Sequence, residues 1–169
     1  MESVFSHVTG VRSAVAGYHG GSAGTADYDR VSSGMTRHAE AVRVVYDPAV
    51  VRYDELLRIF FSVVADPTQR NRQGPDRGPQ FRTALVPLDG EQRAVAAAYL
   101  DQMSRSGPWS APVVAQVEPH RAFYPAEAEH QDFARRNPQH RYVMRHSRAK
   151  VRALAARYPE HYRERPAPR

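Results

Sequence analysis

A chain of 169 residues is about the size of one domain and is long enough to bury a hydrophobic core. Hydrophobic residues make up 41 % and charged residues 25 %, and no apolar run approaches the roughly 20 residues that span a bilayer. The first residues lack the pattern of a signal peptide. We therefore expect a cytoplasmic, monomeric protein without membrane contact. The cysteine count is zero, which excludes a disulfide framework and any thiolate chemistry from these residues alone.

The net charge is +6, and the excess of basic residues is concentrated at the C-terminal end. From Arg135 onward there are eleven arginine or lysine residues, against only Glu160 and Glu164. Such a segment is either a basic patch for nucleic acid or another acidic partner, or a solvated helical face whose arginines reflect codon usage. No aromatic platform is interleaved with the arginines, which favours the solvated face and makes nucleic acid an unexpected partner.

Hydrophobic spacing predicts the elements of the N-terminal half. Val4, Phe5 and Val8 have helical spacing, and Gly10 is well placed to end that helix. The pattern then predicts, in chain order, a strand at 11–18, a glycine-rich loop at 17–24, a strand at 38–46 and a helix at 53–64.

The second half begins with a polar loop at 66–80, whose length is more typical of a functional loop than of a simple connection. Asp89 and Gln92 form a capping-box-like pair at the start of a helix. The remaining pattern predicts strands at 81–88 and 112–117, helices at 89–105, 126–136 and 147–157, and a frayed end at 166–169.

The alternation of helices and strands predicts one α+β domain, a two-layer sandwich with a mixed sheet. The chain contains no internal repeat and no linker that would divide it. We assign residues 1–138 to this domain and residues 139–169 to a basic, partly helical C-terminal extension.

Five groups of residues, in order and at the right spacing, resemble the methionine sulfoxide reductase A family over roughly residues 2–138. They are Gly17-Tyr18-His19-Gly20-Gly21 with Tyr28, Gly34 and His38-Ala39-Glu40; Tyr46-Asp47-Pro48; Asp66-Pro67-Thr68; Asn71-Arg72-Gln73-Gly74 with Asp76, Gly78 and Gln80; and Phe123-Tyr124-Pro125-Ala126-Glu127 with His130-Gln131. The resemblance implies a ferredoxin-like fold and the thiol-dependent reduction of methionine (S)-sulfoxide, free or in proteins, as a repair of oxidative damage.

The resemblance also implies a nucleophilic cysteine, within a Gly-Cys-Phe-Trp-Gly segment at the end of a first strand. Met1 and Glu2 match the two positions that follow that segment. We therefore expect the strand and the cysteine just upstream of Met1, and we expect the 169 residues alone to be inactive. Three explanations stay open: a reading frame that starts further upstream, a deliberately shortened chain, or a true pseudoenzyme.

Three residues take catalytic roles by resemblance. Glu40 protonates the sulfoxide oxygen, the Tyr28 hydroxyl helps to hold that oxygen, and Asp76 organises the site. A carboxyl group beside apolar strand residues has a raised pKa, which suits a proton donor. Without the resemblance, each residue also fits a purely structural role: Glu40 as an exposed strand residue, Tyr28 as a packing residue and Asp76 as a turn-forming residue. Phe81, with Tyr28 and Glu40, is expected to bind substrate.

Phe81 departs from the family, which usually has a tyrosine here. The change removes one hydrogen-bond donor, which costs on the order of 1–3 kcal/mol if that bond matters.

We expect no bound cofactor and no metal, because the eight histidines form no His-x-x-x-His pair. An external thiol such as thioredoxin is the expected reductant. The alternatives are a catalytically dead binding module of the same fold, or an acidic-partner binder that uses the basic C-terminus.

Overall fold

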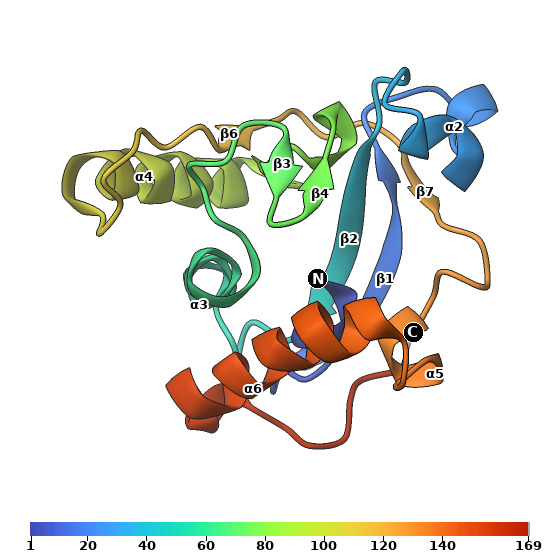
Figure 1. Cartoon of the computed structure of the whole chain (residues 1–169). Coiled ribbons are helices and arrows are strands. Elements are labelled where there is room, and N and C mark those ends of the chain that lie inside the picture. The colour runs from blue at the N-terminus through green and yellow to red at the C-terminus, as the bar shows by residue number, and fades with distance from the viewer. Residues whose placement is uncertain (169) are drawn as a thin grey trace.

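The structure, a computed structural model, describes residues 1–168, so Arg169 lies outside its described part. Two long antiparallel strands, β1 (Val11–His19) and β2 (Ala39–Tyr46), run side by side through its centre (Figure 1). The short β7 (Phe123–Pro125) pairs antiparallel with the other edge of β1, which gives the strand order β2-β1-β7. The predicted strands at 11–18 and 38–46 are confirmed, and the glycine-rich loop begins at Gly20 because residues 17–19 continue β1.

Two smaller pairs of strands stand apart from this central sheet. Within the predicted loop at 66–80, β3 (Arg72–Gln73) and β4 (Asp76–Arg77) form an antiparallel hairpin. The strands β5 (Ala84–Leu85) and β6 (Gln116–Val117) pair in parallel. The α+β class is therefore confirmed, although parallel and antiparallel pairs lie in separate sheets rather than in one mixed sheet. The ferredoxin-like arrangement and the missing first strand stay predictions.

The helices surround the central sheet. Asp89 caps the longest of them, because its carboxylate accepts a hydrogen bond from the Gln92 N–H at 2.7 Å. The Gln92 side chain in turn accepts from the N–H of Leu88 at 3.0 Å, one residue earlier than a capping box requires. The helices are α1 (Glu2–Phe5), α2 (Tyr28–Ser32), α3 (Tyr53–Ile59), α4 (Gly90–Ser106), α5 (Phe133–Arg136) and α6 (Arg148–Arg157), with π-helical turns η2 (Phe60–Val64) and η4 (Val143–Ser147) and 3₁₀ turns η1 (Ala23–Thr25), η3 (Pro79–Phe81) and η5 (Pro159–His161).

Three predicted elements are much shorter than expected. The strand at 81–88 is reduced to β5, since Phe81 ends the turn η3 and Pro87 has no N–H for a sheet. The strand at 112–117 is reduced to β6. The helix at 126–136 is reduced to α5, because Asp132 has a φ of 52° in the left-handed region and interrupts the helical path.

The predicted apolar face of the helix at 53–64 lies in the core. The helix changes to a π-helical turn after Ile59, which keeps the apolar side chains of η2 directed inward. The side chains of α3 and η2 that become buried are Leu56, Leu57, Ile59, Phe60, Phe61, Val63 and Val64. They pack with residues of α1, β1, β5 and α6 in one continuous hydrophobic core.

The C-terminal segment packs into that same core. Leu154 is fully buried, and Val8 pairs with Tyr162 in an isolated β-bridge instead of extending α1. The predicted fraying after residue 165 is wrong for the described residues, because Ala167 is buried and its N–H donates to the Ser6 carbonyl at 2.7 Å. Arg169, which the same prediction covers, lies outside the described residues. The division at residue 138 stays a prediction. No helix of the described residues is long and apolar enough to cross a bilayer.

Gln131 connects the distal motif to the central sheet. Its side chain accepts from the N–H of Ala16 at 3.1 Å and donates to the carbonyls of Ala16 and Ala126 at 2.8 and 2.9 Å. Gln131→Leu leaves these backbone groups without partners inside the protein. We expect it to lower the free energy of unfolding by about 2 kcal/mol, measured by urea denaturation. Gln102→Leu, at an exposed position of α4, is the control and should change it by less than about 0.5 kcal/mol.

Candidate active site

The register of the central sheet places three polar side chains in one row. Tyr18 on β1 is the cross-strand partner of both Glu40 on β2 and Tyr124 on β7. Because directly opposed residues point to the same face of a sheet, the three side chains share one face. Tyr18, at the centre of the row, is only 3 % exposed.

Glu40 has the electrostatic properties of a proton donor. Burial raises its pKa to about 7, and the nearby Asp76 carboxylate adds to that rise, while the Met1 amino group opposes it. A carboxyl group with this pKa is protonated in about half of the molecules at neutral pH. Glu40 is therefore not an exposed strand glutamate, and it can deliver a proton under physiological conditions.

Asp76 lies close to Glu40 and is held by a residue from the C-terminal segment. Its carboxylate accepts a hydrogen bond from the Tyr142 hydroxyl at 2.7 Å, and burial together with this bond raises the pKa of Tyr142. Lys150 is also nearby: burial lowers its pKa, while the Asp76 carboxylate opposes that fall. Its ammonium group donates to the Val64 carbonyl at 2.7 Å.

Sequence reasoning missed both Tyr142 and Lys150. Their place in the site depends on how the C-terminal segment folds back on the rest of the chain, where α6 (Figure 1) packs against α1 and η2. One signal was available, since Lys150 is the only lysine in a chain rich in arginine. The sequence holds no comparable signal for Tyr142.

Tyr28 lies at the rim of the row and is fixed by its backbone and its ring. Its N–H donates to Glu127 at 2.8 Å, and its ring stacks on His130 with the ring centres 4.3 Å apart. The other oxygen of Glu127 accepts from the Tyr18 hydroxyl at 2.8 Å. Burial of Glu127 acts to raise its pKa, but these hydrogen bonds outweigh it and the pKa is lowered. Glu127 thus joins Tyr28 to the centre of the row as a carboxylate.

The Tyr28 hydroxyl is free to meet a ligand. Tyr28 is 45 % exposed, and its hydroxyl forms no hydrogen bond with a described residue. Phe81 ends the turn η3, which packs against the strands that carry Glu40 and Asp76. The structure therefore brings Glu40 and Asp76 together, with Tyr28 and Phe81 on neighbouring elements. The roles of these four residues stay predictions.

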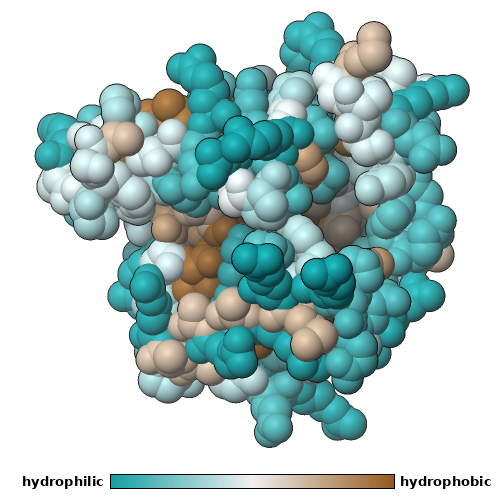
Figure 2. Space-filling model, in the orientation of Figure 1, coloured by the Kyte–Doolittle hydropathy of each residue, from teal (hydrophilic) through white to brown (hydrophobic). Residues whose placement is uncertain are grey.

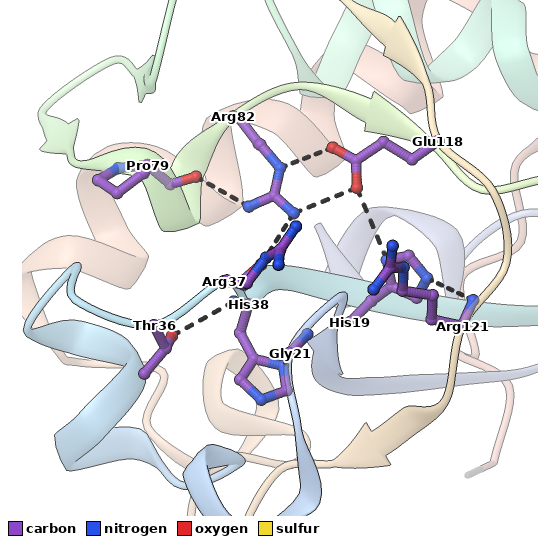
Figure 3. A network of polar contacts seen from close by, with 9 residues as sticks. All are labelled: His19, Gly21, Thr36, Arg37, His38, Pro79, Arg82, Glu118 and Arg121. Atoms are coloured by element: carbon purple, nitrogen blue, oxygen red, sulfur yellow. Dashed lines mark hydrogen bonds and ion pairs between the residues drawn. The ribbon is translucent and has the colours of Figure 1, made fainter.

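A buried histidine fixes the turn between Tyr18 and Glu40, as Figure 3 shows. The Gly21 N–H donates to His38 Nδ1 at 3.2 Å, so the ring proton lies on Nε2 and points to the Ser22 carbonyl at 3.0 Å. A Cβ atom on Gly21 would lie 2.4 Å from the His38 ring, so only glycine fits there. This packing fixes the end of β1 and the start of β2.

A second, partly buried network in Figure 3 surrounds His19 and Arg82. Arg82 binds Glu118 through two hydrogen bonds of 2.6 and 3.1 Å, and His19 Nε2 accepts from the Arg121 N–H at 3.0 Å. Burial lowers the pKa of His19, which keeps the ring neutral. No group of three or more possible metal ligands occurs in the described part of the chain, and the expectation of no metal stays a prediction.

This α+β protein therefore has a carboxyl group of raised pKa, Glu40, beside Tyr18 and Tyr124 on one face of a small antiparallel sheet. Such a site is suited to protonating an oxygen atom of a bound ligand. The sequence profile of the family described as "Peptide methionine sulfoxide reductase" matches residues 1–162. The chain belongs to this family, and the resemblance carried by its motifs is confirmed.

Individual relatives agree with this assignment. Peptide methionine sulfoxide reductase MsrA 2 of Synechocystis is 49 % identical over 160 residues, which cover 95 % of this chain and 75 % of the relative. The protein of the same name from Mesorhizobium japonicum is 42 % identical, over 98 % of this chain and 85 % of its own. Among solved structures, reduced Mxr1 from Saccharomyces cerevisiae superposes with a TM-score of 0.69 at 31 % identity, covering 77 % of this chain and 74 % of Mxr1.

The hydrogen bond between Tyr142 and Asp76 should contribute measurably to stability. Tyr142→Phe keeps the ring and removes the hydroxyl, so we expect the free energy of unfolding to fall by about 1 kcal/mol. Urea denaturation at neutral pH measures this change. Tyr162→Phe is the matched control, because the Tyr162 hydroxyl forms no hydrogen bond with a described residue. Equal effects of the two substitutions would contradict a specific contribution from the Asp76 bond.

Proposed function

We propose that this protein acts in the reduction of methionine (S)-sulfoxide, free or in proteins, and that Glu40 protonates the sulfoxide oxygen. The observation that carries the proposal is the partly buried Glu40 carboxyl, with a pKa of about 7, in a row with Tyr18 and Tyr124. Reduction requires a thiolate to attack the sulfur while the oxygen is held and protonated. Tyr28 supplies a second donor to that oxygen, and Asp76 helps to keep Glu40 protonated.

The reaction requires a thiol from outside the 169 residues, since these contain no cysteine. The thiolate sulfur adds to the substrate sulfur while Glu40 protonates the oxygen. The hydroxyl group then moves to the thiol sulfur, and both the sulfur–oxygen bond of the substrate and the new sulfur–sulfur bond break, which leaves a sulfenic acid on the thiol. The substrate becomes a thioether. A thioredoxin-like protein or a small thiol then reduces the sulfenic acid, and water and a disulfide are released.

The thiol has a suitable place next to Met1. The Met1 amino group lies near Glu40, Asp76 and Lys150, and burial lowers its pKa to about 6, although the residue as a whole is 41 % exposed. A Gly-Cys-Phe-Trp-Gly segment joined to Met1 would bring its cysteine beside Glu40. Reading the codons upstream of Met1 in frame tests whether the gene encodes that segment. A stop codon or unrelated codons there would leave the enzyme without its nucleophile.

The second candidate function is a binding module that holds oxidised methionine without reducing it. The observation that favours it is the lack of cysteine in a chain that keeps Glu40, Tyr28 and Asp76. Titration of the chain with a methionine (S)-sulfoxide peptide separates the two functions. A binding module binds the sulfoxide tightly without the Phe-Trp pair, whereas the reductase requires the added segment for tight binding and turnover.

A further inference from the structure

A cluster of basic residues borders the candidate site. Arg141, Tyr142, Met144, Arg145 and His146 line a shallow hollow at and around η4, and we call these five residues the basic rim. The side chains are accessible: Tyr142 is 41 % and Met144 47 % exposed, and both arginines are exposed. In Figure 2 strongly hydrophilic residues lie over the helix at the front, which Figure 1 labels α6, and a hydrophobic area borders them.

The positive charge of the basic rim is not neutralised within the protein. Among residues 1–168, no acidic side chain forms an ion pair with Arg141 or Arg145. Arg135, earlier in the same basic segment, differs because it is bonded to Asp132 at 2.7 Å. An anionic group that approaches this hollow therefore meets cations that have no competing internal partner.

The basic rim is continuous with the candidate site through Tyr142. The hydroxyl of Tyr142 is bonded to Asp76, while its ring lies 4.9 Å from that of His146. Arg141 directly precedes Tyr142 in the chain and lines the same hollow. A polypeptide with a residue bound at Glu40 has its neighbouring residues within reach of this hollow.

We propose that the basic rim binds acidic residues that flank an oxidised methionine in a protein substrate. This inference rests on the proposed function and adds a substrate class to it. A polypeptide fits better than a nucleic acid, because the Tyr142 ring is held by Asp76 and His146 and the other member between the arginines, Met144, offers no aromatic face for bases. Aspartate or glutamate beside the sulfoxide pairs with Arg141 and Arg145.

Binding of three labelled peptides tests the proposal, in the chain extended before Met1 by Gly-Ser-Phe-Trp-Gly, so that the Phe-Trp pair is present and no thiol consumes the sulfoxide. Each peptide has a central methionine (S)-sulfoxide, flanked by aspartate, serine or lysine, and fluorescence anisotropy gives the dissociation constants. We expect the aspartate peptide to bind about fivefold more tightly than the serine peptide at low salt, and the lysine peptide more weakly than both. At about 0.5 M salt the three values should converge, since exposed charges are screened.

Arg145→Glu is the decisive variant, and Arg93→Glu is its matched control. Both replace an exposed arginine that has no described ion pair, but Arg93 lies on α4, away from the rim (Figure 1). Arg145→Glu should abolish the preference for aspartate, whereas Arg93→Glu should keep it. An unchanged preference in Arg145→Glu, or none in the unsubstituted chain, overturns the proposal.

Two further outcomes separate this inference from the proposed function. If serine-flanked sulfoxide and thioether peptides bind equally while the aspartate preference persists, the basic rim stands and sulfoxide recognition by this chain fails. If sulfoxide is recognised without any effect of the flanking charges, the proposed function stands and the basic rim fails. A single-stranded oligonucleotide that displaces the aspartate peptide and binds more tightly than it overturns the polypeptide assignment in favour of nucleic acid.

Discussion

Glu40→Gln is expected to lower the rate of methionine (S)-sulfoxide reduction by about 10²- to 10⁴-fold, in a chain extended before Met1 by Gly-Cys-Phe-Trp-Gly. The amide has nearly the shape of the carboxyl group but cannot donate the proton that the sulfoxide oxygen requires. Consumption of a sulfoxide peptide in the presence of dithiothreitol measures the rate. In the unsubstituted extended chain the rate should fall as the pH rises above about 7, because Glu40 loses its proton there and the extension removes the Met1 amino group that opposes the rise of its pKa.

Two variants make this result specific. Glu91→Gln, at an exposed position in the first turn of α4, should keep the full rate. Replacing the added cysteine by serine should abolish the reaction, which shows that the thiol carries it. A Glu40→Gln chain that remains as active as its parent would remove Glu40 from the role of proton donor.

Glu40→Gln is also expected to stabilise the chain at alkaline pH by about 3 kcal/mol relative to the unsubstituted protein. The pKa of Glu40 is about 7 in the folded state, against an ordinary value of 4.5. Between these values the folded state binds more protons than the unfolded state, so stability falls as the pH rises from 4.5 to 7. The amide does not titrate and avoids this loss.

Urea denaturation of both chains at about pH 4 and about pH 9 measures the difference. The two chains should differ little in acid, and the variant should be the more stable in alkali. Glu91→Gln is again the control and should follow the unsubstituted protein at both pH values. If the difference between Glu40→Gln and its parent does not depend on pH, then Glu40 titrates near its ordinary value and is not protonated at neutrality.

Local patterns predicted the parts of the fold that place the candidate site. The alternation of β2 and the apolar face of α3 are properties of short segments. The apolar face of α3 is buried as expected, and the second half of β2 alternates between exposed and half-buried side chains. Glu40 and Asp76 come from separate parts of the chain, and only the resemblance to the methionine sulfoxide reductase A family grouped them. The side chain of Asp89 could be recognised as a helix cap because capping depends only on its near neighbours.

The rest of the site depends on contacts between distant segments. Tyr142 meets Asp76 only after the chain has folded back, and no periodicity in the sequence encodes that contact. The predicted strand at 112–117 shows the same limit, since Gln116 and Val117 are strand residues only through pairing with β5. The predicted helix at 126–136 failed because Gln131 bonds the backbone of β1 and Asp132 takes a left-handed conformation.

The most direct test is the stereochemistry of turnover. The chain extended by Gly-Cys-Phe-Trp-Gly is supplied with dithiothreitol and a racemic methionine sulfoxide peptide, and the two epimers are followed by chromatography. A site in which Glu40 and Tyr28 hold the oxygen on one side predicts that only one epimer is consumed, and the proposed function requires that it is the (S) epimer. Consumption of both epimers at equal rates, or of neither while the extended chain is folded, would contradict the proposed function.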